Sequence, residues 1–174
     1  MNIEKVVVGS LETNCYILSI DNHVLIIDPG DEYDKIIKKV GDRMIDGVLV
    51  THSHFDHVGA LPNFDKKLIY DYNNLNEGII TIGKFTFEVV YTPGHNYDLI
   101  NFYFEDDKAL FCGDFIFFES IGRTDLENGD MLHMYLSLKN TKRYSDDVTI
   151  YPGHGIKTSF GHERKYNIYL KKIK

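Results

Sequence analysis

The chain has 174 residues, of which 43% are hydrophobic and 26% charged, and its formal net charge is −7. This composition predicts one globular domain spanning residues 1–174 rather than a disordered chain. The negative charge argues against a general nucleic-acid binder, which needs a basic surface. Apolar runs of only four or five residues predict no membrane span. Two cysteines cannot build a disulfide framework, so a cytoplasmic protein is expected.

The first third of the chain is predicted to be rich in strands, because β-branched runs alternate with turn-forming residues. The expected strands are Ile3–Val8, Cys15–Ile20, Val24–Asp28 and Gly47–Val50. Apolar residues recur at helical spacing over Tyr33–Val40, with Asp31 as the expected N-cap. A second helix is expected over Val58–Leu61, ending near Pro62.

The second half repeats this rhythm of strands, turns and a helix. Its expected strands are Lys67–Tyr70, Ile79–Ile82, Phe85–Tyr91, Ile100–Phe104, Ala109–Cys112 and Val148–Tyr151. A helix capped by Asp130 is expected from Met131 to about Lys142, followed after the last strand by a polar helical tail. The repeated rhythm predicts an α/β fold in which two sheets pack face to face with helices outside.

The segment His52-Ser53-His54-Phe55-Asp56-His57 directly follows a predicted strand. Residues two apart in an extended chain point the same way, so His52 and His54 can aim at one point. The chain then turns, and Asp56 and His57 can face a second point nearby. The plain alternative is a cluster of polar residues in a surface loop.

Three further residues, His95, Asp114 and His154, also follow predicted strands. Loops at the ends of strands in a sandwich converge on one edge, where side chains from distant sequence can meet. Five histidines and two aspartates suit zinc, iron or manganese rather than calcium or magnesium. The set divides into three histidines for one ion, Asp56 with two histidines for another, and one carboxylate left to bridge. Two such ions can share a water and lower its pKa.

Four segments together resemble the metallo-β-lactamase superfamily. They are Thr51–His57, Thr92–His95, Cys112–Asp114 and Tyr151–Gly155. Within that superfamily, Phe118–Leu126 is similar to the glyoxalase II (hydroxyacylglutathione hydrolase) branch, and the tail over 158–167 is similar to its short stand-alone members. The resemblance implies a four-layer αββα sandwich and two metal ions. It assigns His52, His54 and His95 to the first ion, Asp56, His57 and His154 to the second, and Asp114 to both.

The resemblance implies a metal-dependent hydrolase whose small-molecule substrate is a thioester. A hydroxide bridging two divalent ions, zinc before iron or manganese, is expected to attack the carbonyl while the metals stabilise the oxyanion. Asp56 and Asp114 are the expected catalytic carboxylates, with Asp56 helping to orient the hydroxide. Full-length glyoxalase II enzymes carry a C-terminal helical domain that grips glutathione, and this sequence ends twenty residues after His154. Recognition of glutathione is therefore left open.

Two alternatives to the hydrolase remain. Persulfide dioxygenases share the fold and the Gly-Arg-Thr-Asp pattern found at Gly122–Asp125, and use one iron, for which His57, His154 and Asp114 are available. A non-catalytic metal-binding module is the other alternative.

Three residues are candidate substrate contacts, because they lie near ligands in the sequence: Tyr97, Phe117 and Arg123. Arg123 could orient an anionic substrate, since its guanidinium group suits carboxylates, or it could pair with Asp125 to hold the loop.

Overall fold

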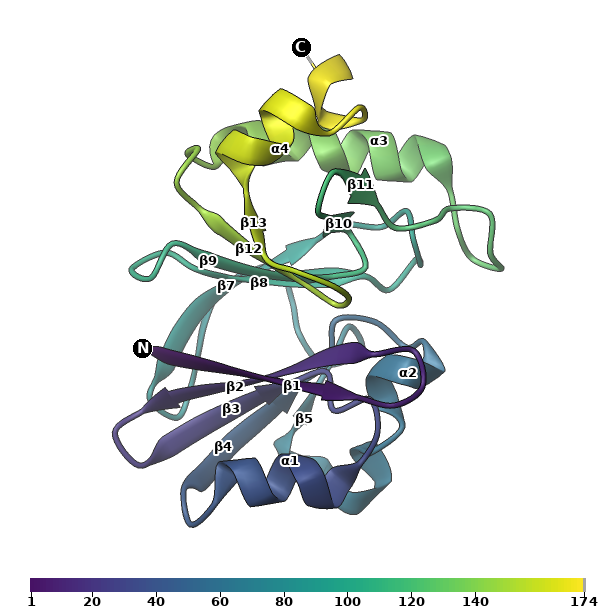
Figure 1. The fold of residues 1–174 in the computed structure, drawn as a ribbon. Helices are drawn as coiled ribbons and strands as arrows, with labels where there is room; N and C mark the ends of the chain where they lie inside the picture. The colour runs from purple at the N-terminus through teal and green to yellow at the C-terminus, as the bar shows by residue number, and fades with distance from the viewer. Residues whose placement is uncertain (174) are drawn as a thin grey trace.

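The computed structural model describes residues 1–173, and its framework is two facing β-sheets (Figure 1). The first sheet has the order β1-β2-β3-β4-β5, with the bounds Asn2–Val8, Thr13–Ile20, His23–Ile27, Met44–Leu49 and Ile69–Tyr70. The second sheet has the order β13-β12-β9-β8-β7-β6. Its strands, from β6 in chain order, are Gly78–Ile82, Phe85–Tyr91, Ile100–Phe104, Ala109–Gly113, Thr149–Pro152 and Thr158–Ser159. A separate hairpin joins β10 (Ile116–Phe117) to β11 (Ser120–Ile121).

Helices cover the outer surface of each sheet. Helix α1 (Tyr33–Val40) lies on the first sheet, while α3 (Met131–Asn140) and α4 (Phe160–Tyr166) lie on the second (Figure 1). Helix α2 (Phe55–Val58) is a single turn at one edge of the sandwich. The short 3-10 helices η1 to η4 are Leu61–Asn63, Lys66–Leu68, Thr141–Arg143 and Leu170–Lys172. No helix within residues 1–173 is long and apolar enough to cross a bilayer.

Three buried cores separate the four layers. Between the sheets, side chains such as Leu25 from β3 and Phe102 from β8 are fully buried. A second core joins the outer face of the first sheet to Ile36 of α1, and a third joins the second sheet to Met134 of α3 and Phe160 of α4. Because each sheet buries both of its faces, β2, β3 and β9 consist largely of continuous apolar runs. The predicted αββα sandwich is confirmed.

Three local predictions were wrong. Glu32, in a left-handed conformation with φ 48°, is the N-cap of α1 in place of Asp31. The helix expected over Val58–Leu61 begins earlier, as α2, and a 3-10 turn follows Gly59. The first half of the strand expected at Lys67–Tyr70 lies in the 3-10 helix η2, which Asp65 caps by accepting a hydrogen bond from the Lys67 amide, and only Ile69–Tyr70 is a strand. At the third site the Asp65 cap outweighs β propensity, and at the second site Pro62 lies in the first turn of the 3-10 helix.

Glu163 of α4 is fully buried and ties the C-terminal segment to the β10–β11 hairpin. Its carboxylate accepts hydrogen bonds from the Thr158 hydroxyl (2.6 Å), the Glu119 amide (2.9 Å) and the Asn167 side-chain amide (2.8 Å). Asn167 also donates to the carbonyl of Ser120 in the hairpin (2.9 Å). The buried carboxylate therefore has a full set of donors, which a buried charge requires.

Candidate metal centre

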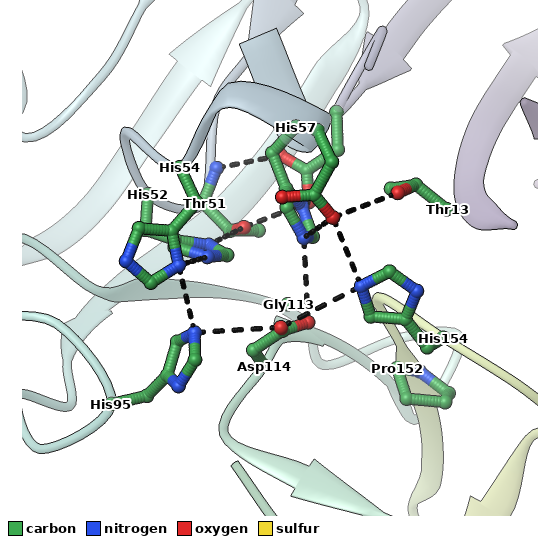
Figure 2. A network of polar contacts seen from close by, with 12 residues as sticks. Thr13, Thr51, His52, His54, His57, His95, Gly113, Asp114, Pro152 and His154 are labelled. Carbon is green, nitrogen blue, oxygen red and sulfur yellow. Dashed lines mark hydrogen bonds and ion pairs between the residues drawn. The ribbon is translucent and has the colours of Figure 1, made fainter. Parts of the chain in front are cut away.

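The strand ends of both sheets bring all seven predicted ligands to one edge of the sandwich (Figure 2). His52 and His54 follow β4, and Asp56 and His57 lie on α2. The other three follow strands of the second sheet, His95 after β7, Asp114 after β9 and His154 after β12. These three strands run in the same direction, since β9 is parallel to β12 and β8 is antiparallel to both β7 and β9. Their carboxyl ends therefore meet at the same edge.

The first group comprises the side chains of His52, His54 and His95. The Nδ1 atom of His54 lies 3.1 Å from Nε2 of His52 and 2.9 Å from Nε2 of His95. Three imidazole nitrogens bound to one tetrahedral zinc stand about 3.3 Å apart. Burial lowers the pKa of His52 well below its usual value, so this imidazole is neutral and offers a lone pair. The spacing of the three nitrogens and the neutral imidazole of His52 are what a metal ion needs.

The second group comprises Asp56, His57 and His154. Asp56 Oδ2 lies 3.2 Å from Nε2 of His154 and 3.5 Å from Nε2 of His57. The same oxygen accepts a hydrogen bond from the Thr13 hydroxyl (3.0 Å), which fixes its direction.

Asp114 lies between the two groups, as Figure 2 shows. Its Oδ1 is 3.4 Å from Nε2 of His57, and its Oδ2 is 3.4 Å from Nε2 of His95 and 3.6 Å from Nε2 of His154. Burial raises the pKa of this carboxyl, but the nearby histidines, His57 above all, bring it below its usual value. The ionised carboxylate can therefore serve both groups.

Unpartnered buried atoms show that the residues fit a metal. Among the described residues, His57 Nε2 and Asp114 Oδ1 are buried without a hydrogen-bond partner, and both face this site. A buried polar atom without a partner is costly, and a bound cation would remove that cost. Three histidines have their Nδ1–H directed at a fixed acceptor: Asp28 for His57 (2.9 Å), the Arg123 carbonyl for His95 (2.8 Å) and the Leu11 carbonyl for His154 (3.0 Å). These contacts leave Nε2 of each of the three rings free to bind a metal ion.

Nearby carboxylates raise the pKa of both histidines in the second group. Burial lowers the pKa of His57, but the carboxylates of Asp28 and Asp114 outweigh burial and raise it to about 10. Burial likewise opposes protonation of His154, whereas contact with Asp56 raises its pKa. A metal ion would take the place of these protons, since a ligating imidazole must be neutral.

Sequence reasoning missed the residues that orient the ligands. Asp28 is 2% exposed and accepts hydrogen bonds from the Thr51 amide (2.8 Å) and the Thr51 hydroxyl (2.7 Å), in addition to His57. A signal was present, because Asp28 directly follows β3, and β3 is the parallel neighbour of β4. The carboxyl ends of parallel neighbours lie together, so Asp28 must lie beside the Thr51–His57 loop. The roles of Thr13 and of the two backbone carbonyls have no comparable signal.

A clamp between the two sheets holds the loop of His154. The Asn14 amide donates to the carbonyl of Gly153 (2.7 Å), and its side chain donates to the carbonyls of Pro152 (2.9 Å) and Gly155 (3.0 Å). Gly153 itself must lack a side chain, because a Cβ there would lie 2.4 Å from Asp114 Oδ1 and 2.6 Å from His57 Cε1.

The three candidate substrate contacts lie at different places. Arg123 lines the cleft of about 580 Å³ that opens above His54, His95 and His154, but its guanidinium group pairs with Asp125 through bonds of 2.8 and 2.9 Å. The Phe117 ring is 6.1 Å from the His154 ring, while Tyr97 is 56% exposed and packs against Tyr72. Neither Phe117 nor Tyr97 is among the residues that line this cleft. The substrate roles of all three stay predictions.

Known proteins resemble this chain over almost its whole length. The hydroxyacylglutathione hydrolase GloC of Haemophilus influenzae is 32% identical over 209 aligned positions, which cover 98% of each chain. The solved structure of BLEG-1 B3 metallo-beta-lactamase has a TM-score of 0.91 and 29% identity, covering 97% of this chain and 99% of that one. TTHA1623 in a di-iron-bound form has a TM-score of 0.86 and 29% identity, covering 96% and 100%. ETHE1 from Myxococcus xanthus has a TM-score of 0.88 and 26% identity, covering 99% and 86%.

The family comparison agrees with the fold and with the ligand pattern. The sequence model of the metallo-beta-lactamase superfamily matches residues 8–72 and 68–154, which include all seven clustered side chains. The protein therefore belongs to the metallo-beta-lactamase superfamily.

Proposed function

We propose that this metallo-hydrolase holds two divalent transition-metal ions and cleaves a thioester. The observation that carries the proposal is the carboxylate of Asp114, which lies within 3.6 Å of histidine nitrogens from both ligand groups. A site for a single ion would need neither a carboxylate shared between two groups nor a second set of three ligands. The named hydrolase relative from Haemophilus influenzae supports a thioester as the substrate.

The proposed ligands follow the two groups and the residue between them. His52, His54 and His95 hold one ion, Asp56, His57 and His154 hold the other, and Asp114 bridges. Zinc suits this set of imidazoles and carboxylates, and iron and manganese are the alternatives. The di-iron-bound form of TTHA1623 supports iron as one of the metals that such a site can hold. Cys15 and Cys112 are both buried free thiols, which favours a reducing compartment such as the cytoplasm.

Two bound ions would supply an activated water and a positive charge that stabilises the tetrahedral oxyanion. The protein's own groups set the direction of attack. Asp56, fixed by Thr13 and lying beside His57 and His154, would orient the attacking water. Asp28 holds His57 in one tautomer. The thiol leaves as a thiolate with a reference pKa near 8.5, so the reaction needs no strong general acid.

Metal analysis tests the number of ions. Protein purified without chelators and titrated with Zn²⁺ or Mn²⁺ should bind close to two ions per chain. Saturation at one ion would contradict the bridging role of Asp114.

An assay for thiol release tests the reaction. The zinc-loaded protein should release free thiol from acyl thioesters, including acylglutathiones, while an oxygen electrode records no uptake. A chromogenic cephalosporin is the comparison substrate, because BLEG-1 is named as a B3 metallo-beta-lactamase. Faster turnover of the cephalosporin than of every thioester would replace the proposed reaction with β-lactam hydrolysis.

A second candidate is oxidation of a persulfide at a single iron, which the Gly-Arg-Thr-Asp pattern at Gly122–Asp125 favours. It predicts the opposite result in the same assay. The Fe²⁺-loaded protein would consume oxygen with glutathione persulfide and leave thioesters intact.

A further inference from the structure

Three large apolar side chains are exposed to solvent around the cleft above the metal centre. Phe55 at the start of α2 is 74% exposed, Leu11 in the β1–β2 turn is 51% exposed, and Leu126 on the segment before α3 is 39% exposed. Leu11 and Phe55 also line one neighbouring hollow, so the two side chains are close together. We call Leu11, Phe55 and Leu126 the apolar wall of the cleft. Apolar groups gathered around a polar centre mark a surface that a ligand covers.

Among residues 1–173, lysine and arginine side chains offer this cleft almost no free positive charge. In the part of the chain that the structure describes, Arg123 is the single lysine or arginine that lines the cleft, and both Nε and Nη2 of Arg123 donate to Asp125. The carboxylate of Glu127 lies on the same segment and adds negative charge. A ligand carboxylate placed here would have to compete with Asp125 for the guanidinium group and would be repelled by Glu127.

We infer that the cleft selects thioesters that join an apolar acyl chain to a thiol without carboxylates. This inference rests on the proposed thioester hydrolysis and names its substrate class. Glutathione carries two carboxylates, and recognition of a carboxylate normally uses a bidentate arginine or a similar set of donors. The apolar wall instead matches a hydrocarbon chain, which gains from each methylene that it buries.

A matched set of thioesters separates the acyl preference from the thiol preference. The probes are acetyl-N-acetylcysteamine, octanoyl-N-acetylcysteamine and octanoylglutathione, assayed with the zinc-loaded protein for thiol release. We expect kcat/KM to rise about twofold to fourfold for each methylene that the wall covers. We also expect octanoyl-N-acetylcysteamine to exceed octanoylglutathione by about tenfold, because the glutathione carboxylates find no free partner.

Three variants locate the effect. Phe55→Ser and Leu126→Ser should each reduce the octanoyl-over-acetyl preference, whereas Ile79→Ser should leave it unchanged. Ile79 is a matched control, because it is 75% exposed and lies on β6 away from the cleft. Asp125→Asn frees Arg123 and should raise kcat/KM for octanoylglutathione alone.

The outcomes separate this inference from the proposed function. A wild-type preference for octanoylglutathione, or a chain-length preference unchanged in Phe55→Ser and Leu126→Ser, would overturn the inference and leave the thioesterase standing. If no thioester is cleaved, the proposed function fails. Calorimetry with two non-hydrolysable thioethers, S-octyl-N-acetylcysteamine and S-octylglutathione, then tests the cleft directly. Tighter binding of the first, weakened in Phe55→Ser, supports the apolar wall, and equal or absent binding overturns it.

Discussion

The two sheets contribute to the metal centre in different ways. The first sheet supplies four of the seven side chains from one short segment, 52–57, at the end of β4. The second sheet supplies three from three separate turns, with Asp114 lying 19 residues after His95 and His154 a further 40 residues on. The four side chains of the first sheet are close together in the sequence, whereas the three of the second sheet come together only after that sheet has formed. The three side chains from the second sheet consequently depend on distant backbone contacts, and one of them, Asp114, contacts both groups, so its substitution should affect both proposed metal positions.

The largest effect is expected for Asp114→Ala, which removes the residue between the groups. Its loss should weaken both proposed metal positions and reduce turnover about 10³-fold, since the two positions would lose their shared negative charge. His52→Ala removes a ligand of one group and should chiefly empty that position. Metal content and kcat measured side by side check the contrast. Full metal content with wild-type turnover in Asp114→Ala would make the bridging assignment wrong.

Gly153→Ala tests whether the close approach of the turn over residues 152–155 to Asp114 and His57 matters for activity. The added methyl group would lie 2.4 Å from Asp114 Oδ1, so one of the two must move, and we expect turnover to fall about 10²-fold. Gly155→Ala in the same turn is the control. Its φ of +75° makes alanine strained there, but a Cβ would meet nothing within 4 Å. If both variants lose turnover equally, strain in the turn rather than a clash at the metal centre explains the loss.

Asp28→Asn tests whether Asp28 orients the segment 51–57 of the first sheet for metal binding. The amide cannot hold the Nδ1–H of His57 and both Thr51 donors equally well, so metal affinity should fall about 10- to 100-fold. Asp46→Asn is a matched control, because Asp46 forms a similar pair with His23 (2.8 Å) away from the centre. Competition with a chromogenic chelator measures both. Equal affinities in the two variants would show that Asp28 has only a structural role.

The smallest effect on catalysis is expected for Glu163→Gln, which weakens the anchor of the β10–β11 hairpin. Three groups donate hydrogen bonds to the Glu163 carboxylate, and the NH₂ group of glutamine cannot accept from the one that it would face. The free energy of unfolding should therefore fall by about 2 kcal/mol. For a chain of this length the melting temperature should fall by about 4–8 °C. Glu105→Gln, at an exposed position, should leave it unchanged. A lower melting temperature with unchanged metal content would place the role of Glu163 in folding alone.

Sequence and structure agree best where the signal is local or periodic. The alternation of strands predicted both sheets, and the spacing of histidines and aspartates predicted all seven clustered side chains. The 3-10 helix at Lys66–Leu68 escaped prediction, because one aspartate cap outweighed the strand propensity of its neighbours. The backbone carbonyls of Leu11 and Arg123 escaped for a different reason. Every residue has a backbone carbonyl, so the amino-acid sequence does not indicate which carbonyl orients a histidine, and only the folded structure reveals it.

The clamp that Asn14 makes on residues 152–155 bears on the conformational entropy of metal uptake. Ordering a residue's backbone costs about 1–2 kcal/mol, and here three hydrogen bonds from Asn14 between the sheets order the turn of His154. The free energy of metal coordination is then not reduced by the cost of ordering the turn of His154. Metal uptake should leave the amide hydrogen-exchange rates of this turn almost unchanged, so that the site behaves as a rigid receptor whose empty and filled forms share one backbone.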